Sequence, residues 1–163
     1  MKYKASLDKL AWIVTIVVTV LFVGAAALQI GLMNQVDSIV PVTISIGLLL
    51  IYAIAFAFRP AGYTVSRDQL IIHRPLKNVT LAKSDIQTAQ VITKKDIGWA
   101  VRTFGVGGLF GYYGKFANST IGNMTWYATR MDKPVLITTV HDKKIIVTPD
   151  EPEQFVNDLL SGK

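Results

Sequence analysis

The chain has 163 residues, a formal net charge of +6, no cysteine and a hydrophobic content of 51%. Without cysteine, neither a disulfide framework nor a thiolate metal site can be built. The hydrophobic share exceeds that of an ordinary soluble protein and is concentrated in one region, because Asp37 is the only charged side chain between Leu10 and Phe58. The pattern predicts a membrane-embedded N-terminal part and a soluble remainder, divided near Arg59 and Pro60.

Two apolar stretches, about Leu10 to Met33 and about Ile39 to Phe58, predict transmembrane helices. About 20 apolar residues at a rise of about 1.5 Å each cross the roughly 30 Å hydrocarbon layer. The short segment from Asn34 to Ser38 has room for a turn between them. We therefore expect residues 1–59 to hold an N-terminal tail and a two-helix transmembrane hairpin.

Basic residues flank the predicted hairpin on one side only. Lys2, Lys4 and Lys9 precede the first stretch and Arg59 follows the second, while the turn has no Lys or Arg. The positive-inside rule then predicts a multi-pass protein of the cell membrane with both termini in the cytoplasm. The alternative is a cleaved signal peptide, since Ala25–Ala27 could supply a small-residue cleavage site.

After Pro60 the hydrophobic pattern changes to short alternating runs typical of β-strands. Seven strands are expected, at about Tyr63–Val65, Leu70–Ile72, Val79–Leu81, Ile86–Thr93, Met124–Thr129, Pro134–Val140 and Lys144–Thr148. We expect residues 60–163 to form one mainly β domain, built as a strongly bent sheet or partial barrel.

A short amphipathic helix is expected at the C-terminal end of this domain. Asp150 is the expected N-cap, and Pro152 falls in the first turn, where proline is tolerated. One face of the helix is apolar and consists of Phe155, Val156, Leu159 and Leu160. We expect this helix to close the open end of the bent sheet, with Phe155 buried.

Three segments carry a resemblance to a known family: Arg102–Phe116, rich in glycine and aromatic residues, the alternating Thr125–Thr129, and the ending Thr148–Phe155. With the two preceding spans, the chain resembles the bacterial pleckstrin-homology (PH)-like membrane proteins. The resemblance implies a PH-like fold and a membrane location. Eukaryotic relatives that bind phosphoinositides look like they use several Lys and Arg in a long first hairpin loop. This chain departs from that pattern, because its first hairpin loop offers only Arg67 beside Asp68, so specific phosphoinositide binding is not expected.

The glycine- and aromatic-rich run is the most specific part of the sequence. It lacks the Gly-Lys-Ser/Thr ending of a P-loop and the acidic partner of a dinucleotide fingerprint, so nucleotide binding is not expected. We expect a long loop here, whose large side chains either complete the core or form a binding surface. We predict the surface, with candidate binding residues Arg102, Phe104, Leu109, Phe110, Tyr112, Tyr113, Lys115 and Phe116.

Residues for catalysis or metal binding do not stand out. His73 and His141 have no metal-ligand neighbours at useful spacing, and no nucleophile lies beside a base. No enzyme activity, cofactor or metal is therefore expected. We assign the basic pI of about 9.6 to anionic headgroups near the domain rather than to nucleic acid.

The short linker decides where the domain works. Arg59–Ala61 can span roughly 10 Å, which keeps the domain at the membrane surface. We predict a non-enzymatic binding or scaffold module at the cytoplasmic face, with the lipid bilayer and a protein or peptide as partners and the oligomeric state left open. The alternative is an accessory subunit of a membrane enzyme or transporter that acts through its transmembrane hairpin.

Overall fold

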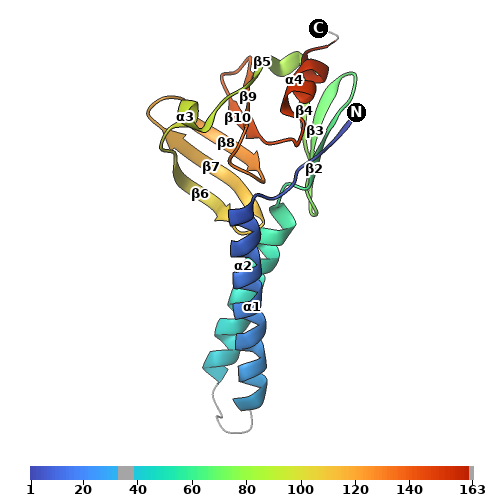
Figure 1. Ribbon diagram of the computed structural model, residues 1–163. Coiled ribbons are helices and arrows are strands. Elements are labelled where there is room, and N and C mark those ends of the chain that lie inside the picture. Colours follow the sequence, from blue (N-terminus) through green and yellow to red (C-terminus); the bar gives the residue numbers. More distant parts are fainter. Residues whose placement is uncertain (33–38, 162–163) are drawn as a thin grey trace.

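The computed structural model describes the backbone of residues 1–32 and 39–161, and the side chains of residues 1–29 and 42–161. Two long helices, α1 (Lys9–Leu32) and α2 (Ile39–Phe58), project from a β domain at one end (Figure 1). The turn predicted at Asn34–Ser38 lies outside the described residues. The N-terminal end of α1 and the C-terminal end of α2 both lie next to the domain.

The apolar character of the helices supports a membrane anchor. Among the described side chains, Lys9–Gln29 form one helical segment that is long and apolar enough to cross a membrane, with a mean hydropathy of 2.5. Val42–Phe58 form a shorter apolar helix. Large side chains on both helices, such as Leu21 and Ile51, are exposed, whereas a core helix of a soluble domain would bury them. One candidate span is thus found, and the second span remains a prediction.

The first sheet contains an unexpected strand from the N-terminal end of the chain. It has the order β1-β2-β3-β4, all antiparallel, with β1 at Lys2–Lys4, β2 at Gly62–Val65, β3 at Gln69–His73 and β4 at Val79–Ala82. Lys2 pairs with Thr64, and the Val65 N–H donates to the Met1 carbonyl at 2.8 Å. The N-terminal tail therefore lies in the β domain of the structure.

The second sheet has the order β5-β9-β10-β8-β7-β6. Its strands are β5 (Ile86–Val91), β6 (Val101–Gly108), β7 (Gly111–Asn118), β8 (Gly122–Ala128), β9 (Val135–Thr139) and β10 (Lys144–Val147). The short helix η1 (Lys83–Asp85) precedes β5, and the short helix α3 (Lys94–Ile97) lies between β5 and β6. Strands β8 and β10 run parallel, and the other described pairs are antiparallel.

The seven predicted strands correspond to β2, β3, β4, β5, β8, β9 and β10. Three of the ten strands in the described residues were not predicted: β1 in the tail, and β6 and β7 in the segment expected to be a loop. The strands were expected in a strongly bent sheet or partial barrel, and the described strands divide into two hydrogen-bonded sheets.

The C-terminal helix α4 (Pro152–Leu160) is present as expected and packs against a core to which both sheets contribute. Phe155 is fully buried, and its ring meets those of Tyr3 and Tyr63 edge-on, with centroids 5.2 and 5.8 Å apart. The prediction of Asp150 as N-cap was wrong, because Glu151 occupies that position and makes no side-chain cap. Asp150 instead accepts hydrogen bonds from Ser6 (N 3.0 Å, Oγ 2.6 Å).

Replacing Phe155 by alanine should destabilise the domain by about 3 to 5 kcal/mol, because it removes a fully buried ring from the core. We expect the melting temperature of the full chain, followed by near-UV circular dichroism, to fall by more than about 10 °C. Asn157→Ala, on the exposed side of the same helix, is the control and should leave it nearly unchanged. Equal melting of the two variants would show that α4 does not hold the core together.

Candidate functional site

The glycine- and aromatic-rich run forms a regular β-hairpin, so the prediction of a long loop was wrong. Strands β6 and β7 pair from Val101↔Ala117 to Gly108↔Gly111, and Leu109 and Phe110 make the turn. Gly105 and Gly114 face each other with φ of +117° and +122°, and a Cβ on either would overlap the backbone of the opposite strand. These glycines serve close backbone approach rather than flexibility.

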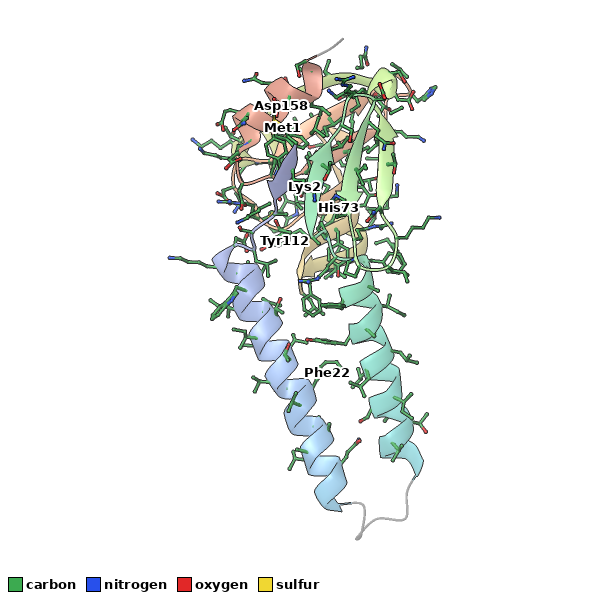
Figure 2. All side chains as sticks on the ribbon, turned by 90° about the vertical axis from the view of Figure 1, so that its right-hand side faces the viewer. Met1, Lys2, Phe22, His73, Tyr112 and Asp158 are labelled. Carbon is green, nitrogen blue, oxygen red and sulfur yellow. The ribbon has the colours of Figure 1, made fainter. Side chains whose placement is uncertain are left out.

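Two of the candidate aromatic residues belong to the core. Tyr112 and Phe116 are buried with Trp126, whose ring stacks on that of Phe116 with centroids 4.4 Å apart. The Tyr112 hydroxyl donates to the Asp8 carboxylate at 3.2 Å, and burial together with that carboxylate raises the pKa of Tyr112. Figure 2 places Tyr112 at the base of the domain, close to the start of α1. The prediction that these two rings form a surface was wrong.

Two other aromatic residues join the hairpin to the helices. The Phe110 ring packs edge-on against Tyr52 and Phe56 of α2, with centroids 5.2 and 5.4 Å apart. The Phe110 N–H donates to Thr15 Oγ1 of α1 at 2.9 Å. The turn therefore contacts both helices at once.

Tyr113 and Arg59 complete this contact. The Tyr113 hydroxyl donates to the Ala55 carbonyl, one of the last four of α2, which have no partner within a helix. Arg59 lies over the Phe56 and Phe110 rings, 4.5 and 5.8 Å from their centroids. We call Phe110, Tyr113, Tyr52, Phe56 and Arg59 the aromatic junction.

Asp8 fixes the start of α1 to the same domain. Its carboxylate accepts from Ala11 N at 2.7 Å, which is N-cap geometry, and from Met131 N at 3.2 Å. Neither Asp8 nor Thr15 was predicted from the sequence. A signal for Asp8 was present, since an acidic residue directly before an apolar helix is a common N-cap.

The remaining candidate residues are accessible to solvent. Phe104 is 78% exposed, Arg102 is exposed and lies over Gly107, and Leu109 is half-buried. Lys115 is exposed, and its ammonium donates to Thr125 Oγ1 at 2.8 Å. The eight predicted residues therefore divide into core, junction and surface.

A groove of about 710 Å³ opens between α2 and the second sheet, next to the aromatic junction. Ile51, Ile54, Ala55 and Phe58 line it from the helix, and Phe104, Gly105, Val106, Tyr113, Gly114, Lys115, Thr125 and Tyr127 line it from β6, β7 and β8. Arg74, just after β3, completes the lining. We call this the helix-side groove; its described lining has two cations and no Asp or Glu.

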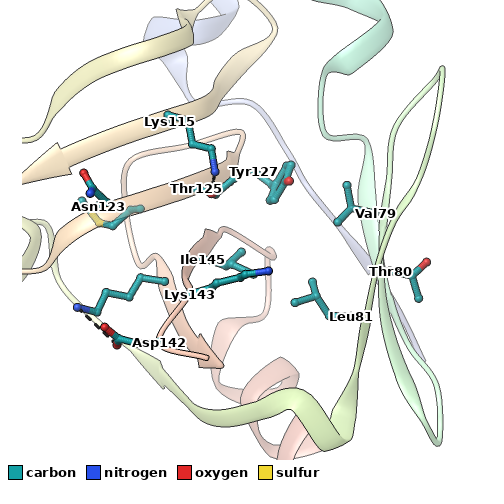
Figure 3. Close-up of a pocket in the computed structure, with 12 residues that line it drawn as sticks. Val79, Thr80, Leu81, Lys115, Asn123, Thr125, Tyr127, Asp142, Lys143 and Ile145 are labelled. Carbon is teal, nitrogen blue, oxygen red and sulfur yellow. Dashed lines mark hydrogen bonds and ion pairs between the residues drawn. The ribbon is translucent and has the colours of Figure 1, made fainter. Parts of the chain in front are cut away.

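A second groove of about 500 Å³ lies between β4 and strands β8 and β10 (Figure 3). It shares Lys115, Thr125 and Tyr127 with the helix-side groove, so the two grooves adjoin. Burial raises the pKa of Tyr127, and the charge of Arg74 opposes that rise. At the boundary between the two grooves, the cationic side chain of Lys115 therefore lies near the aromatic ring of Tyr127.

The histidines take no part in these grooves. His73 shares a hydrogen bond of 2.7 Å with Thr64 Oγ1, and His141 is exposed in a turn. Within the part of the chain that the structure describes, no three His, Asp or Glu side chains gather closely enough to hold a metal ion.

Two packed sheets, a C-terminal helix over the core and an N-terminal apolar helix define a PH-like domain with a possible membrane anchor. Residues 61–162 match the family described as bacterial PH domain, and the chain belongs to that family. No curated protein and no solved structure matches the chain. The resemblance to bacterial PH-like proteins is thereby confirmed.

Shortening Phe110 should loosen the hairpin turn from the helices. Phe110→Ala removes a ring that is only 6% exposed, and a loss of about 3 kcal/mol would raise local opening roughly 100-fold. Hydrogen exchange of the 108–114 amides in the full chain measures this. Phe104→Ala, an exposed phenylalanine on the same hairpin, is the control, and equal exchange in both variants would contradict the role of the junction.

Proposed function

We propose that this bacterial PH domain is a membrane-anchored, non-enzymatic binding module that recognises a ligand at the cytoplasmic membrane face. The helix-side groove is the observation that carries the proposal. It is largely apolar, bordered by two cations, and bounded on one side by the apolar helix α2. Pockets of about 300 to 1,000 Å³ that combine apolar walls with a few polar groups are the usual form of ligand sites.

We also propose that α1 and α2 both cross the membrane, so that the chain is multi-pass. Two features support this topology. The start of α1 and the end of α2 are bonded to one domain, through Asp8 and Tyr113 respectively. A cleaved signal peptide would remove Lys2–Lys4, which form a strand of that domain.

The basic residues support a cytoplasmic domain. Lys2, Lys4, Lys9 and Arg59 flank the domain ends of the helices in the sequence, where the positive-inside rule counts cytoplasmic charge. With the anchoring supplied by the helices, membrane recruitment would be redundant. The domain is therefore free to recognise a ligand that is already at the membrane.

A charge placed at the mouth of the helix-side groove should abolish ligand binding without unfolding the domain. Phe104→Glu changes a side chain that is 78% exposed, and we expect at least about a tenfold loss of any component that copurifies stoichiometrically with the full chain from native membranes. Trp99→Glu is the matched control, because Trp99 is 88% exposed and does not line the groove.

The alternative function makes the opposite forecast. If the chain is an accessory subunit that acts through its helices, Phe104→Glu retains its partner. Replacing exposed residues of α1, such as Leu21 and Val20, then releases the partner instead.

The absence of cysteine allows a direct test of topology. Lys95→Cys places a single thiol on the exposed helix α3 of the domain. In intact cells we expect no labelling by a membrane-impermeant maleimide, and full labelling after the membrane is opened. Labelling of intact cells would place the domain outside the cytoplasm and would contradict the proposed orientation.

A further inference from the structure

We propose that the helix-side groove binds an anionic membrane lipid, with one acyl chain along α2 and the phosphate between Arg74 and Lys115. This inference rests on the proposed binding function and names the class of ligand. The site differs from the first hairpin loop of the domain, because neither Arg67 nor Asp68 lines the groove.

The apolar wall of the groove continues onto the exposed surface of α2. Ile51 and Ile54 line the groove and are 63% and 57% exposed, so they also face the surroundings of the helix. With α2 in a bilayer, those surroundings are acyl chains. From Ile51 to Phe58 the helix rises about 10 Å towards the domain, so an acyl chain can enter from the hydrocarbon layer without crossing water.

The cations stand at the domain side of this wall and have no acidic partner. Neither Arg74 nor Lys115 forms an ion pair with a carboxylate in the described residues. The Arg74 guanidinium lies 5.3 Å from the Phe58 ring centroid and 5.7 Å from that of Tyr127, and its Nε donates to the Lys77 carbonyl at 2.7 Å. The aromatic rings and this hydrogen bond hold the side chain at the groove, where a phosphate could bind its other N–H groups.

The β3–β4 turn that carries Arg74 is itself fixed to α2. The Leu76 N–H donates to the Ala57 carbonyl at 3.0 Å, and Leu76 is 66% exposed. Arg74 is therefore held near the end of α2, which under the proposed topology is the level where headgroups meet the hydrocarbon layer.

A lipid fits this groove better than a peptide does. An extended peptide lying against Ile51 and Ile54 would bring unpaired backbone N–H and C=O groups to membrane depth, where no water can satisfy them. An acyl chain has no such groups. An anionic headgroup also complements a lining with two cations and no described Asp or Glu, whereas a zwitterionic headgroup gains less.

The test counts lipids bound to the full chain in mixed micelles, by native mass spectrometry. The probes are phosphatidylglycerol and phosphatidylcholine with identical acyl chains. We expect the wild-type chain to prefer phosphatidylglycerol about 30-fold, the factor that two cations near an anionic headgroup supply. Arg74→Gln with Lys115→Gln should reduce the preference to about twofold or less, and Lys94→Gln with Lys95→Gln, on α3, should keep it.

A second pair of variants tests the acyl chain. Ile54→Trp fills the groove and should lower the retention of both lipids at least about tenfold while leaving both cations in place. Ile44→Trp is the control, because Ile44 is similarly exposed on α2 but does not line the groove. Thermal melting of each variant shows whether the domain stays folded.

Several outcomes overturn the inference. Equal headgroup preference in the Arg74/Lys115 and Lys94/Lys95 double variants removes the phosphate site, and equal retention by Ile54→Trp and Ile44→Trp removes the acyl site. Competition by soluble glycerol phosphate as strong as that by the lipid assigns the site to a free phosphate. If lipid counts do not change but Phe104→Glu still releases a copurified protein, the ligand is a protein and the binding function stands; if neither responds, both proposals fail.

Discussion

The contact of Phe110 with both helices sets the geometry of the molecule. Its ring packs on Tyr52 and Phe56, and its backbone N–H binds Thr15, so one residue at a hairpin turn fixes α1, α2 and the second sheet relative to one another. Phe110 has a positive φ of 58°, a conformation that bulky residues rarely adopt, and the ring contacts offset its cost. The helix-side groove exists because this contact holds α2 beside β6 and β7.

The contacts continue along the helices beyond the junction. Tyr52 Oη lies 2.7 Å from Thr19 Oγ1, and the Tyr52 ring is 5.4 Å from that of Phe22. Phe22 lies between the two helices in Figure 2. A chain of aromatic contacts thus leads from Arg59 down between α1 and α2. We therefore expect a change in the packing of the two helices to shift the hairpin turn, which lies next to the groove.

Local patterns predicted the seven strands whose alternation is regular, and the apolar face of α4, because both depend on residues close in sequence. The strands β6 and β7 were missed because five glycines between Gly105 and Gly114 resemble a loop, and their role depends on which backbone faces them. The positions of the Tyr112 and Phe110 side chains also depend on partners that are distant in the sequence, Asp8 and Tyr52 respectively. The composition of the run indicated an important segment, but not which rings face the core, the helices or the solvent.

Strand β1 imposes an order on the formation of the protein. Lys2–Lys4 are synthesised before both helices, yet their partners in β2 follow only after both helices. The ring that packs on Tyr3, that of Phe155, is synthesised later still, since α4 follows all the strands of the two sheets. Such long-range pairing makes folding slow, because the entropy of closing a long loop is lost before the contacts of the core form. Under the proposed topology, the helices insert into the bilayer while the first sheet is still incomplete. The first sheet can then form only after β1 and β2, which flank the two helices, have come to lie on the same side of the membrane.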